Sequence, residues 1–349
     1  MVVVADIDSC VGENGHLNGH FAFVASQYQR ILGRDCCVAG GRPYLRFEGF
    51  VRLPFCARRC GNRFINKLKN IANLFCLFRK ARGGTVVLQS QAPVIVMLGV
   101  LLFARWERVF MIYYEGLRGT LRRMLWRMMK RKVCGVICPN KRIGETYGIE
   151  YLVVTDYIYD VRQWTSDSEL ECKYDFATVG ILSAEKGVAE AIRVIGRSGK
   201  RYLVAGRPRS ESDRAWLEDA AKHYPNVELK TGYMSDDEYD SCIRQARCGL
   251  LNYSGAYSEH SSGVVFDFLF RNRPVVGRSC TTLDFIAEKG IGVVYSDLSR
   301  VNIEKTLESV TSKATKSAIS DYLSWNARQA DLLCHFVRGS SRTREKEVS

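Results

Sequence analysis

The sequence predicts an α/β protein with two tandem domains, each built on a parallel, Rossmann-like sheet. The chain has 349 residues, more than one hydrophobic core usually serves, so we expect two domains. Apolar residues make up 46% and charged residues 25% of the chain, which is typical of globular proteins. Short apolar runs alternate with amphipathic stretches, and this alternation indicates βαβ units with parallel strands.

The C-terminal half shows the alternation most clearly. Six strands are expected there, in "YDFATVGIL", "RYLVAG", "NVELKTG", "CGLLNYS", "RPVVG" and "IGVVYSD". Apolar residues at helical spacing predict helices between them, as at Val188, Ala191, Ile192 and Ile195. Ser235 and Glu238 fit a capping box at the start of one of these helices. Ligands of such sheets bind at the carboxyl ends of the strands.

The N-terminal half repeats the pattern less regularly. A strand is expected in "MVVVADID", a loop and a helix over 15–32, and further strands over 85–90, 108–116 and 132–140. An irregular polar stretch before Tyr174 predicts the domain boundary. We therefore expect an N-terminal domain over 1–160, a C-terminal domain over 161–315, a helix over 316–338 that packs back across both, and a frayed tail over 339–349.

The cysteines and the apolar runs exclude several classes of protein. The 13 cysteines are scattered, with no CxxC pair and no Cys/His cluster at zinc spacing. Neither a disulfide framework nor a structural metal is expected, and free thiols suit a reducing cytoplasm. The N-terminus lacks the basic leader and cleavage site of a secretory signal. The longest apolar run, 92–104, is shorter than the roughly 20 residues of a membrane-spanning helix and predicts a buried helix.

The positive charge is concentrated in the N-terminal half. The net charge of the chain is +14, and residues 1–160 hold 24 Lys and Arg against 11 Asp and Glu. This imbalance predicts an anionic partner for the N-terminal domain. The segment "RGTLRRMLWRMMKRK" (118–132) interleaves cations with apolar residues, as helices on anionic bilayers do. A solvated helix face is the alternative, and no nucleic-acid recognition motif is present. The candidate membrane-facing residues are Arg122, Arg123, Trp126 and Arg127.

The stretch "SEHSSGVVFDFLFRNRPVV" (258–276) follows the fourth strand of the C-terminal domain. Ser261, Ser262 and Gly263 lie at the expected start of a helix, where unpaired N–H groups and the helix dipole favour a phosphate. Glu259 and Asp267 flank this turn, and a carboxylate can accept two neighbouring sugar hydroxyls. The alternative is that Ser262 only caps the helix and Asp267 complements its dipole. Physical chemistry alone leaves both interpretations open.

The same stretch resembles the signature of the retaining family 4 glycosyltransferases, whose GT-B fold has two Rossmann-like domains facing each other across a cleft. That signature has two Glu separated by seven residues, then a basic residue and Pro-Val-Ile. Here Glu259 and Asp267 keep the spacing and "RPVV" follows, but Asp267 is one methylene shorter and the turn is serine-rich. The resemblance implies that Glu259 contacts the donor sugar, residues 261–263 the sugar and pyrophosphate, and Asp267 the ribose.

Two further segments resemble the family. In "VGILSAEKG", which contains Gly180, Lys186 matches the lysine that neutralises the leaving diphosphate. Ile181 stands where the family has an arginine, and Arg207 or Arg209 is the candidate substitute. In "NVELKTGYMSDDE", Tyr233 is a candidate contact to the base, with a partly buried structural tyrosine as the alternative.

In the N-terminal domain the resemblance is one of layout. The glycine-rich segment after the first strand makes Gly15, His16, Gly19 and His20 candidates for an acceptor and phosphate loop, with a plain turn and helix cap as the alternative. Glu115 ends a strand where many relatives have a histidine near the reacting sugar, so it is a candidate catalytic residue of the acceptor site.

The resemblance implies a glycosyltransferase of the hexosyltransferase type. It would move a sugar from a nucleotide-diphosphate sugar to a lipid-linked or polysaccharide acceptor, with retention of configuration and without a metal or other cofactor. The expected location is the cytoplasm, including the inner face of the membrane. An anionic membrane surface is an expected partner of the basic N-terminal domain, and nucleic acid is not. The alternatives are a sugar-nucleotide epimerase or hydrolase of the same fold, and a non-catalytic nucleotide-sugar-binding protein.

Overall fold

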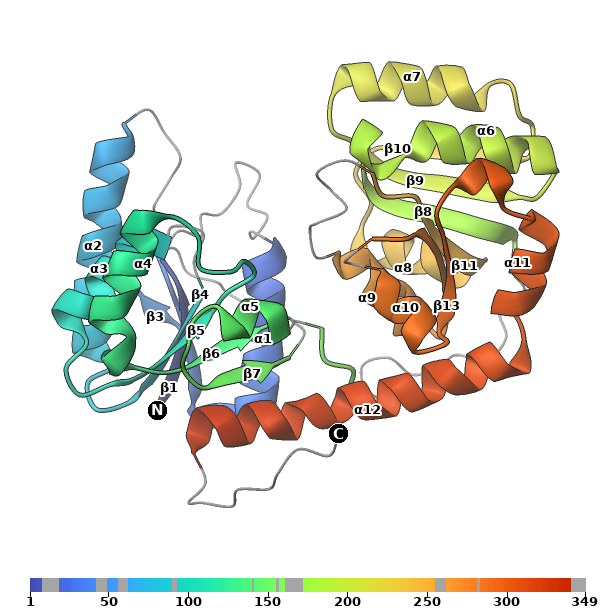
Figure 1. Ribbon diagram of the computed structural model, residues 1–349. Helices are drawn as coiled ribbons and strands as arrows, with labels where there is room; N and C mark the ends of the chain where they lie inside the picture. Colours follow the sequence, from blue (N-terminus) through green and yellow to red (C-terminus); the bar gives the residue numbers. More distant parts are fainter. Residues whose placement is uncertain are drawn as a thin grey trace. The chain divides into compact units, whose positions relative to one another are not determined.

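The computed structural model describes residues 1–7, 19–41, 49–55, 62–89, 93–139, 141–154, 157–160, 172–254, 262–280 and 283–339. The chain divides into two compact units (Figure 1). Unit 1 comprises Met1–Ile158 and Arg328–Ser349, and unit 2 comprises Tyr159–Ala327. The predicted boundary lay at residue 160, and unit 1 regains the chain from Arg328 onwards.

Unit 1 is built on a parallel sheet with the strand order β3-β2-β1-β4-β5-β6-β7. Four of its strands were predicted: β1 (Val2–Asp6), β4 (Thr85–Gln89), β5 (Arg108–Ile112) and β6 (Val133–Cys138). The sequence analysis missed β2 (Cys36–Gly40), β3 (Val51–Arg52) and β7 (Tyr151–Val153). The strands β3 and β7 are short edge strands, and β2 has the sequence "CCVAG" with a single β-branched residue.

Helices cover both faces of this sheet, because successive side chains of a strand point to opposite faces. Val3, Val86 and Val109 belong to one core, together with residues of α2 (Arg63–Lys80), α3 (Pro93–Phe103) and α4 (Thr120–Met129). Val2, Val4 and Val87 belong to the other core, together with residues of α1 (Gly19–Leu32) and the end of α12 (Lys313–Arg338). The short helix α5 (Lys141–Glu145) precedes β7.

Unit 2 is built on a parallel sheet with the order β10-β9-β8-β11-β12-β13. All six strands were predicted: β8 (Tyr174–Leu182), β9 (Tyr202–Pro208), β10 (Val227–Thr231), β11 (Ala246–Leu251), β12 (Val275–Arg278) and β13 (Gly292–Tyr295). The helices are α6 (Val188–Ser198), α7 (Glu211–Ala221), α8 (Asp236–Arg244), α9 (Gly263–Leu269), α10 (Asp284–Glu288) and α11 (Ile303–Val310). The predicted capping box of Ser235 and Glu238 is confirmed.

The helix α12 belongs to both units in turn. In its first half Ile319 and Tyr322 are buried, and the Tyr322 ring packs against Phe285 of unit 2. In its second half Leu333 and Val337 lie in a core of unit 1. Apolar residues thus continue at helical spacing from one unit into the other.

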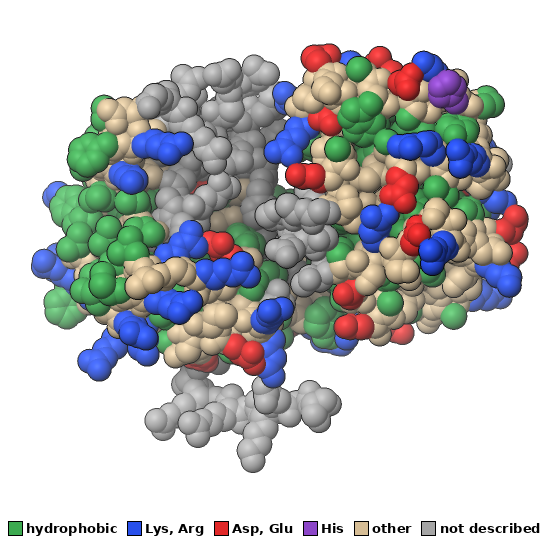
Figure 2. Space-filling model, turned by 45° about the horizontal axis from the view of Figure 1, so that its top comes forward, with side chains coloured by type: hydrophobic (Ala, Val, Ile, Leu, Met, Phe, Trp, Pro, Cys, Tyr) green, Lys and Arg blue, Asp and Glu red, His purple; other side chains and the backbone are tan. Residues whose placement is uncertain are grey.

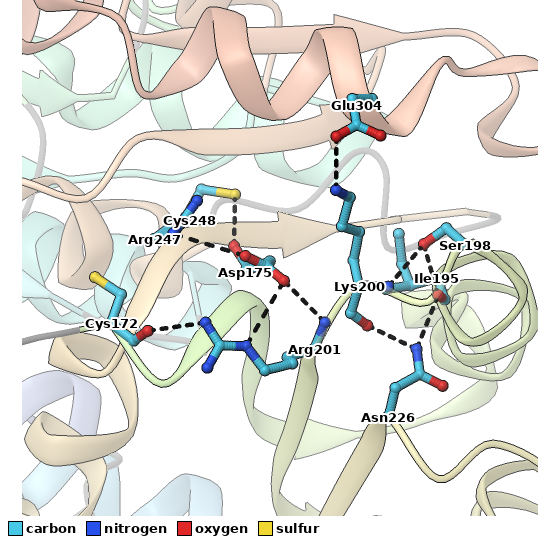
Figure 3. A network of polar contacts seen from close by, with 10 residues as sticks. All are labelled: Cys172, Asp175, Ile195, Ser198, Lys200, Arg201, Asn226, Arg247, Cys248 and Glu304. Carbon is cyan, nitrogen blue, oxygen red and sulfur yellow. Dashed lines mark hydrogen bonds and ion pairs between the residues drawn. The ribbon is translucent and has the colours of Figure 1, made fainter.

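A polar network fastens the amino ends of the strands of unit 2 (Figure 3). Asp175, at the start of β8, accepts a hydrogen bond of 2.9 Å from the Arg201 backbone and lies 3.6 Å from the Arg247 guanidinium. Lys200 pairs with Glu304 at 2.8 Å. Because ligands of parallel sheets bind at the opposite, carboxyl edge, we assign this network to stability.

Candidate active site

The carboxyl edge of the sheet of unit 2 brings two glycines into close contact. Gly180 of β8 and Gly206 of β9 are register partners with φ of 97° and 151°. A Cβ on Gly206 would lie 1.7 Å from the Gly180 carbonyl oxygen. Only glycine allows the two strand ends to approach so closely. Backbone without side chains therefore lies next to the turn that contains Lys186.

Lys186 lies in the turn between β8 and α6. Its side chain is 5% exposed, and burial lowers the pKa of its ammonium group to about 8. A Cβ on Gly180 would lie 4.0 Å from its Nζ atom. A buried ammonium that has lost much of its hydration gains most from an anion placed beside it. Lys186 is therefore well suited to bind a phosphate group.

Arg207 lies beside the position where the family arginine is missing. In the parallel pairing of β8 with β9, Ile181 is the register partner of Arg207, and both side chains are exposed. Arg209, the other candidate, pairs with Glu185 at 3.5 Å. Since register partners of neighbouring strands project to the same side of a sheet, Arg207 can place a cation close to where an arginine at 181 would.

Asn252 holds the turn after Lys186 in place, a residue that the sequence analysis missed. Its Nδ2 donates to the Gly187 carbonyl and to the Glu190 carboxylate, both at 3.0 Å. The Tyr295 hydroxyl donates to its Oδ1, also at 3.0 Å. The only signal in the sequence was a polar residue directly after the apolar end of β11.

The turn before α9 is described from Ser262 onwards; Glu259 and Ser261 lie outside the described residues. Ser262 occupies the N-cap position but makes no side-chain cap hydrogen bond. Its buried hydroxyl lies 2.6 Å from the Tyr253 hydroxyl instead. The interpretation of Ser262 as a simple helix cap is therefore wrong. Gly263, the first residue of α9, is half-buried.

Asp267 faces α8. The Tyr239 hydroxyl donates to its Oδ2 at 2.8 Å, and burial raises the pKa of its carboxyl group above the usual value. Arg271 donates to its backbone carbonyl at 2.8 Å. The carboxylate is thus held between α8 and α9, with one oxygen engaged by Tyr239.

Tyr233 follows Gly232 at the carboxyl end of β10. Its side chain is 71% exposed, so the alternative of a partly buried structural tyrosine is wrong. It lines a cavity of about 410 Å³ together with Thr231, Met234 and residues of α8. A larger cavity of about 720 Å³ lies between α6 and α7, and its lining includes neither Lys186 nor Tyr233.

The structure describes only some of the predicted acceptor residues of unit 1. Gly15 and His16 lie outside the described residues, whereas Gly19 and His20 form the first turn of α1 instead of a loop. Glu115 is exposed and pairs with Arg122. The sequence analysis missed Asp6 and Gln89, which are buried register partners at the carboxyl ends of β1 and β4.

The predicted membrane-facing residues divide into two groups. Arg123 and Arg127 are exposed, and Arg122 is partly exposed beside Glu115. Trp126 is 2% exposed, and its indole donates to the Tyr147 carbonyl at 2.7 Å. The prediction that Trp126 faces a membrane is therefore wrong, because residue 126 lies on the side of α4 that packs on the sheet.

Within the described ranges, no three His, Cys, Asp or Glu side chains form a group that could hold a metal ion. Among the helices of those same ranges, none has the length and apolarity needed to cross a membrane.

No family model and no curated protein matches the sequence. Solved structures match nearly all of it. A glycosyltransferase from Rickettsia africae covers 97% of this chain and 99% of its own, with 10% identity and a TM-score of 0.70. The E. coli trehalose-6-phosphate protein bound with UDP-2-fluoro glucose covers 98% and 100%, with 9% identity and a TM-score of 0.66. A glycosyltransferase involved in avilamycin A biosynthesis covers 97% and 98%, with 14% identity and a TM-score of 0.62.

The chain has the GT-B fold. This confirms the predicted fold class. The solved structures that share this fold are only 9–14% identical to the chain. The fold alone therefore identifies neither the donor nor the acceptor.

Proposed function

We propose that this protein is a glycosyltransferase that uses a nucleotide-diphosphate sugar as donor. The observation that carries the proposal is the buried Lys186 at the carboxyl end of β8, with Arg207 beside Ile181 on the neighbouring strand. Two cations at the ligand-binding edge of a parallel sheet suit the diphosphate of such a donor. The GT-B fold of the chain supports this reading.

In the proposed reaction the bond between the sugar carbon and the diphosphate oxygen breaks while the acceptor hydroxyl attacks from the same face, so that configuration is retained. The proton of the acceptor hydroxyl passes to the leaving diphosphate oxygen. Lys186 and Arg207 stabilise the negative charge that grows on the leaving diphosphate. Preorganised groups of this kind are worth about 10²–10³ in rate each. Asp267 is the proposed contact to the ribose, Tyr233 to the base and Glu259 to the donor sugar. These groups neutralise the diphosphate without a metal ion.

The acceptor in this proposal is a lipid-linked or polysaccharide glycan, and the protein works in the cytoplasm at the inner face of the membrane. The charge of unit 1 supports this part: residues 1–160 hold 24 Lys and Arg against 11 Asp and Glu. An anionic surface attracts such a domain. Gly19, His20 and Glu115 are the proposed acceptor-side residues.

The test is a panel of nucleotide sugars, scored by thermal shift and then by transfer of labelled sugar to a lipid extract. We expect one donor to stabilise the protein and Lys186→Ala to weaken its binding at least about tenfold. Arg197→Ala, an exposed arginine of α6, is the matched control. Stabilisation that survives in Lys186→Ala would refute the assigned site, and binding without transfer to any acceptor would favour a non-catalytic binder.

A further inference from the structure

Helices α2 and α4 of unit 1 expose large apolar side chains at helical spacing. In α2, Phe64, Leu68 and Phe75 recur after four and seven residues, so they share one side of the helix, and Phe64 is 67% exposed. In α4, Leu121, Met124 and Met128 recur after three and four residues and are all more than half exposed. The buried side of α4 consists of other residues, Leu125, Trp126 and Met129. The helix therefore has two apolar sides, of which the sheet covers one.

The helix α3 joins these two helices into one layer, because it packs against both. The Phe75 ring meets the Phe103 ring edge-on at 5.5 Å. Leu102 in the last turn of α3 and Trp106 after the helix are exposed, the latter to 72%. A cavity of about 310 Å³ opens between the ends of α2 and α3, lined by Phe75 and Trp106 among others. We call the exposed side of α2, α3 and α4 the outer face.

The outer face is strongly cationic. The segments 62–82, 93–107 and 118–134 contain 14 Lys and Arg and a single acid, Glu107. Arg63, Lys67, Arg79, Arg123 and Arg127 are among the exposed cations. Figure 2 shows apolar and cationic side chains intermixed on the flank of unit 1 at the left. Apolar side chains exposed within a cationic surface are the composition of a bilayer-binding surface.

We propose that the outer face docks on an anionic lipid bilayer, with the apolar side chains of α2 and α4 and Trp106 entering the interface. The proposal rests on the proposed function and identifies the surface by which that enzyme reaches a lipid-linked acceptor. A second copy of the chain fits this face poorly, because two such faces would bring like charges together. The surface spans three helices, whereas the membrane-facing residues named from the sequence all lie on α4 and include the buried Trp126.

The experiment measures binding of the full chain to vesicles of phosphatidylcholine, alone or mixed with phosphatidylglycerol. One variant, Leu121→Gln/Met124→Gln/Met128→Gln, removes the apolar side chains of α4 without changing charge. A second, Arg123→Glu/Arg127→Glu, reverses two charges. The matched controls are Leu332→Gln, exposed on α12, and Arg193→Glu/Arg197→Glu, exposed on α6.

We expect binding to the anionic vesicles only, weakening with added salt. Each outer-face variant should lose about tenfold or more in affinity, and the controls less than about twofold. Equal binding by the outer-face variants, or no binding of the unmodified chain to anionic vesicles, would overturn the proposal. So would a dimer in sedimentation velocity that the α4 variant abolishes. Without vesicles, both variants should bind the nucleotide sugar as the unmodified chain does. If the proposed function is wrong, nucleotide-sugar binding is absent while vesicle binding remains, so the two failures can be told apart.

Discussion

At the scale of single residues, Lys186 carries an energetic cost for its position. Its pKa falls from 10.5 to about 8 because burial disfavours the charged form. Between these two values the unfolded chain binds a proton that the folded chain does not, so the free energy of unfolding rises with pH there. Below pH 8 the full cost applies, at most about 3 kcal/mol. Strongly shifted pKa values of this kind are found most often at functional sites.

Lys186→Met should therefore change how stability depends on pH. The free energy of unfolding of the unmodified chain should rise between about pH 8 and pH 10.5, because only the unfolded chain keeps the Lys186 proton there. We expect Lys186→Met to lack this rise, which amounts to about 3 kcal/mol. Urea denaturation of both proteins at several pH values measures the difference, and the same pH dependence in both would contradict the assigned pKa shift.

Arg207 and Arg209 offer a second comparison between neighbouring residues. Arg207→Ala should weaken nucleotide-sugar binding about tenfold or more, because it removes a charge-assisted contact to the diphosphate. Arg209→Ala should change it little, since Arg209 already pairs with Glu185. Isothermal titration of both variants decides the assignment. A larger loss with Arg209→Ala would move the second cation to that residue.

At the scale of elements, the connection from β8 to α6 depends on close approach of backbone. Gly187 adopts a left-handed conformation with φ of 61°, and a Cβ there would lie 2.3 Å from the Asn252 carbonyl oxygen. Gly199, at the other end of α6, has φ of 72° with nothing within 4 Å of its Cβ position. The two glycines share the conformation and differ in the space around them.

Gly187→Ala should cost about 3 kcal/mol or more, whereas Gly199→Ala should cost about 1 kcal/mol, the ordinary penalty of a left-handed residue. Chemical denaturation of the two variants gives the difference, which isolates the contact with Asn252. Equal costs would mean that the connection can move away from β11. In that case Lys186 would not be held as firmly as we infer.

The elements themselves were predictable where apolar residues followed a regular period. All six strands of unit 2 carry apolar runs between helices, and the sequence predicts each of them. The strands β3 and β7 have two and three residues and lie at the sheet edges, so they carry too little pattern. In the candidate site, Lys186 could be predicted from its motif, whereas Asn252 became visible only through its hydrogen bonds.

At the scale of the whole molecule, the two units have separate cores, and α12 contributes to both. Ile319 is fully buried in unit 2, and Leu333 is fully buried in a core of unit 1. Truncating either residue leaves a cavity in one unit only. The same helix therefore allows the stability of each unit to be tested by a matched substitution.

Leu333→Ala should destabilise unit 1, and Ile319→Ala unit 2, each by about 3 kcal/mol. Differential scanning calorimetry should show a different transition shifted to lower temperature in each variant. A nucleotide sugar should raise the transition that Ile319→Ala lowers, because the proposed donor site lies in unit 2. If both variants lower a single common transition, the two units unfold as one.

The sequence by itself determined the two parallel-sheet units of the GT-B fold, the position of Lys186 and the excess of positive charge before residue 160. These depend on local periodicity and composition, which a single chain displays directly. Only the tertiary structure decided that Arg207 lies opposite Ile181, that Tyr239 engages Asp267, and that α4 buries Trp126 while exposing Met124. Which residues of two strands pair is fixed by contacts between distant parts of the chain. The helix α4 is apolar on two sides, so its local pattern does not tell which side packs on the sheet.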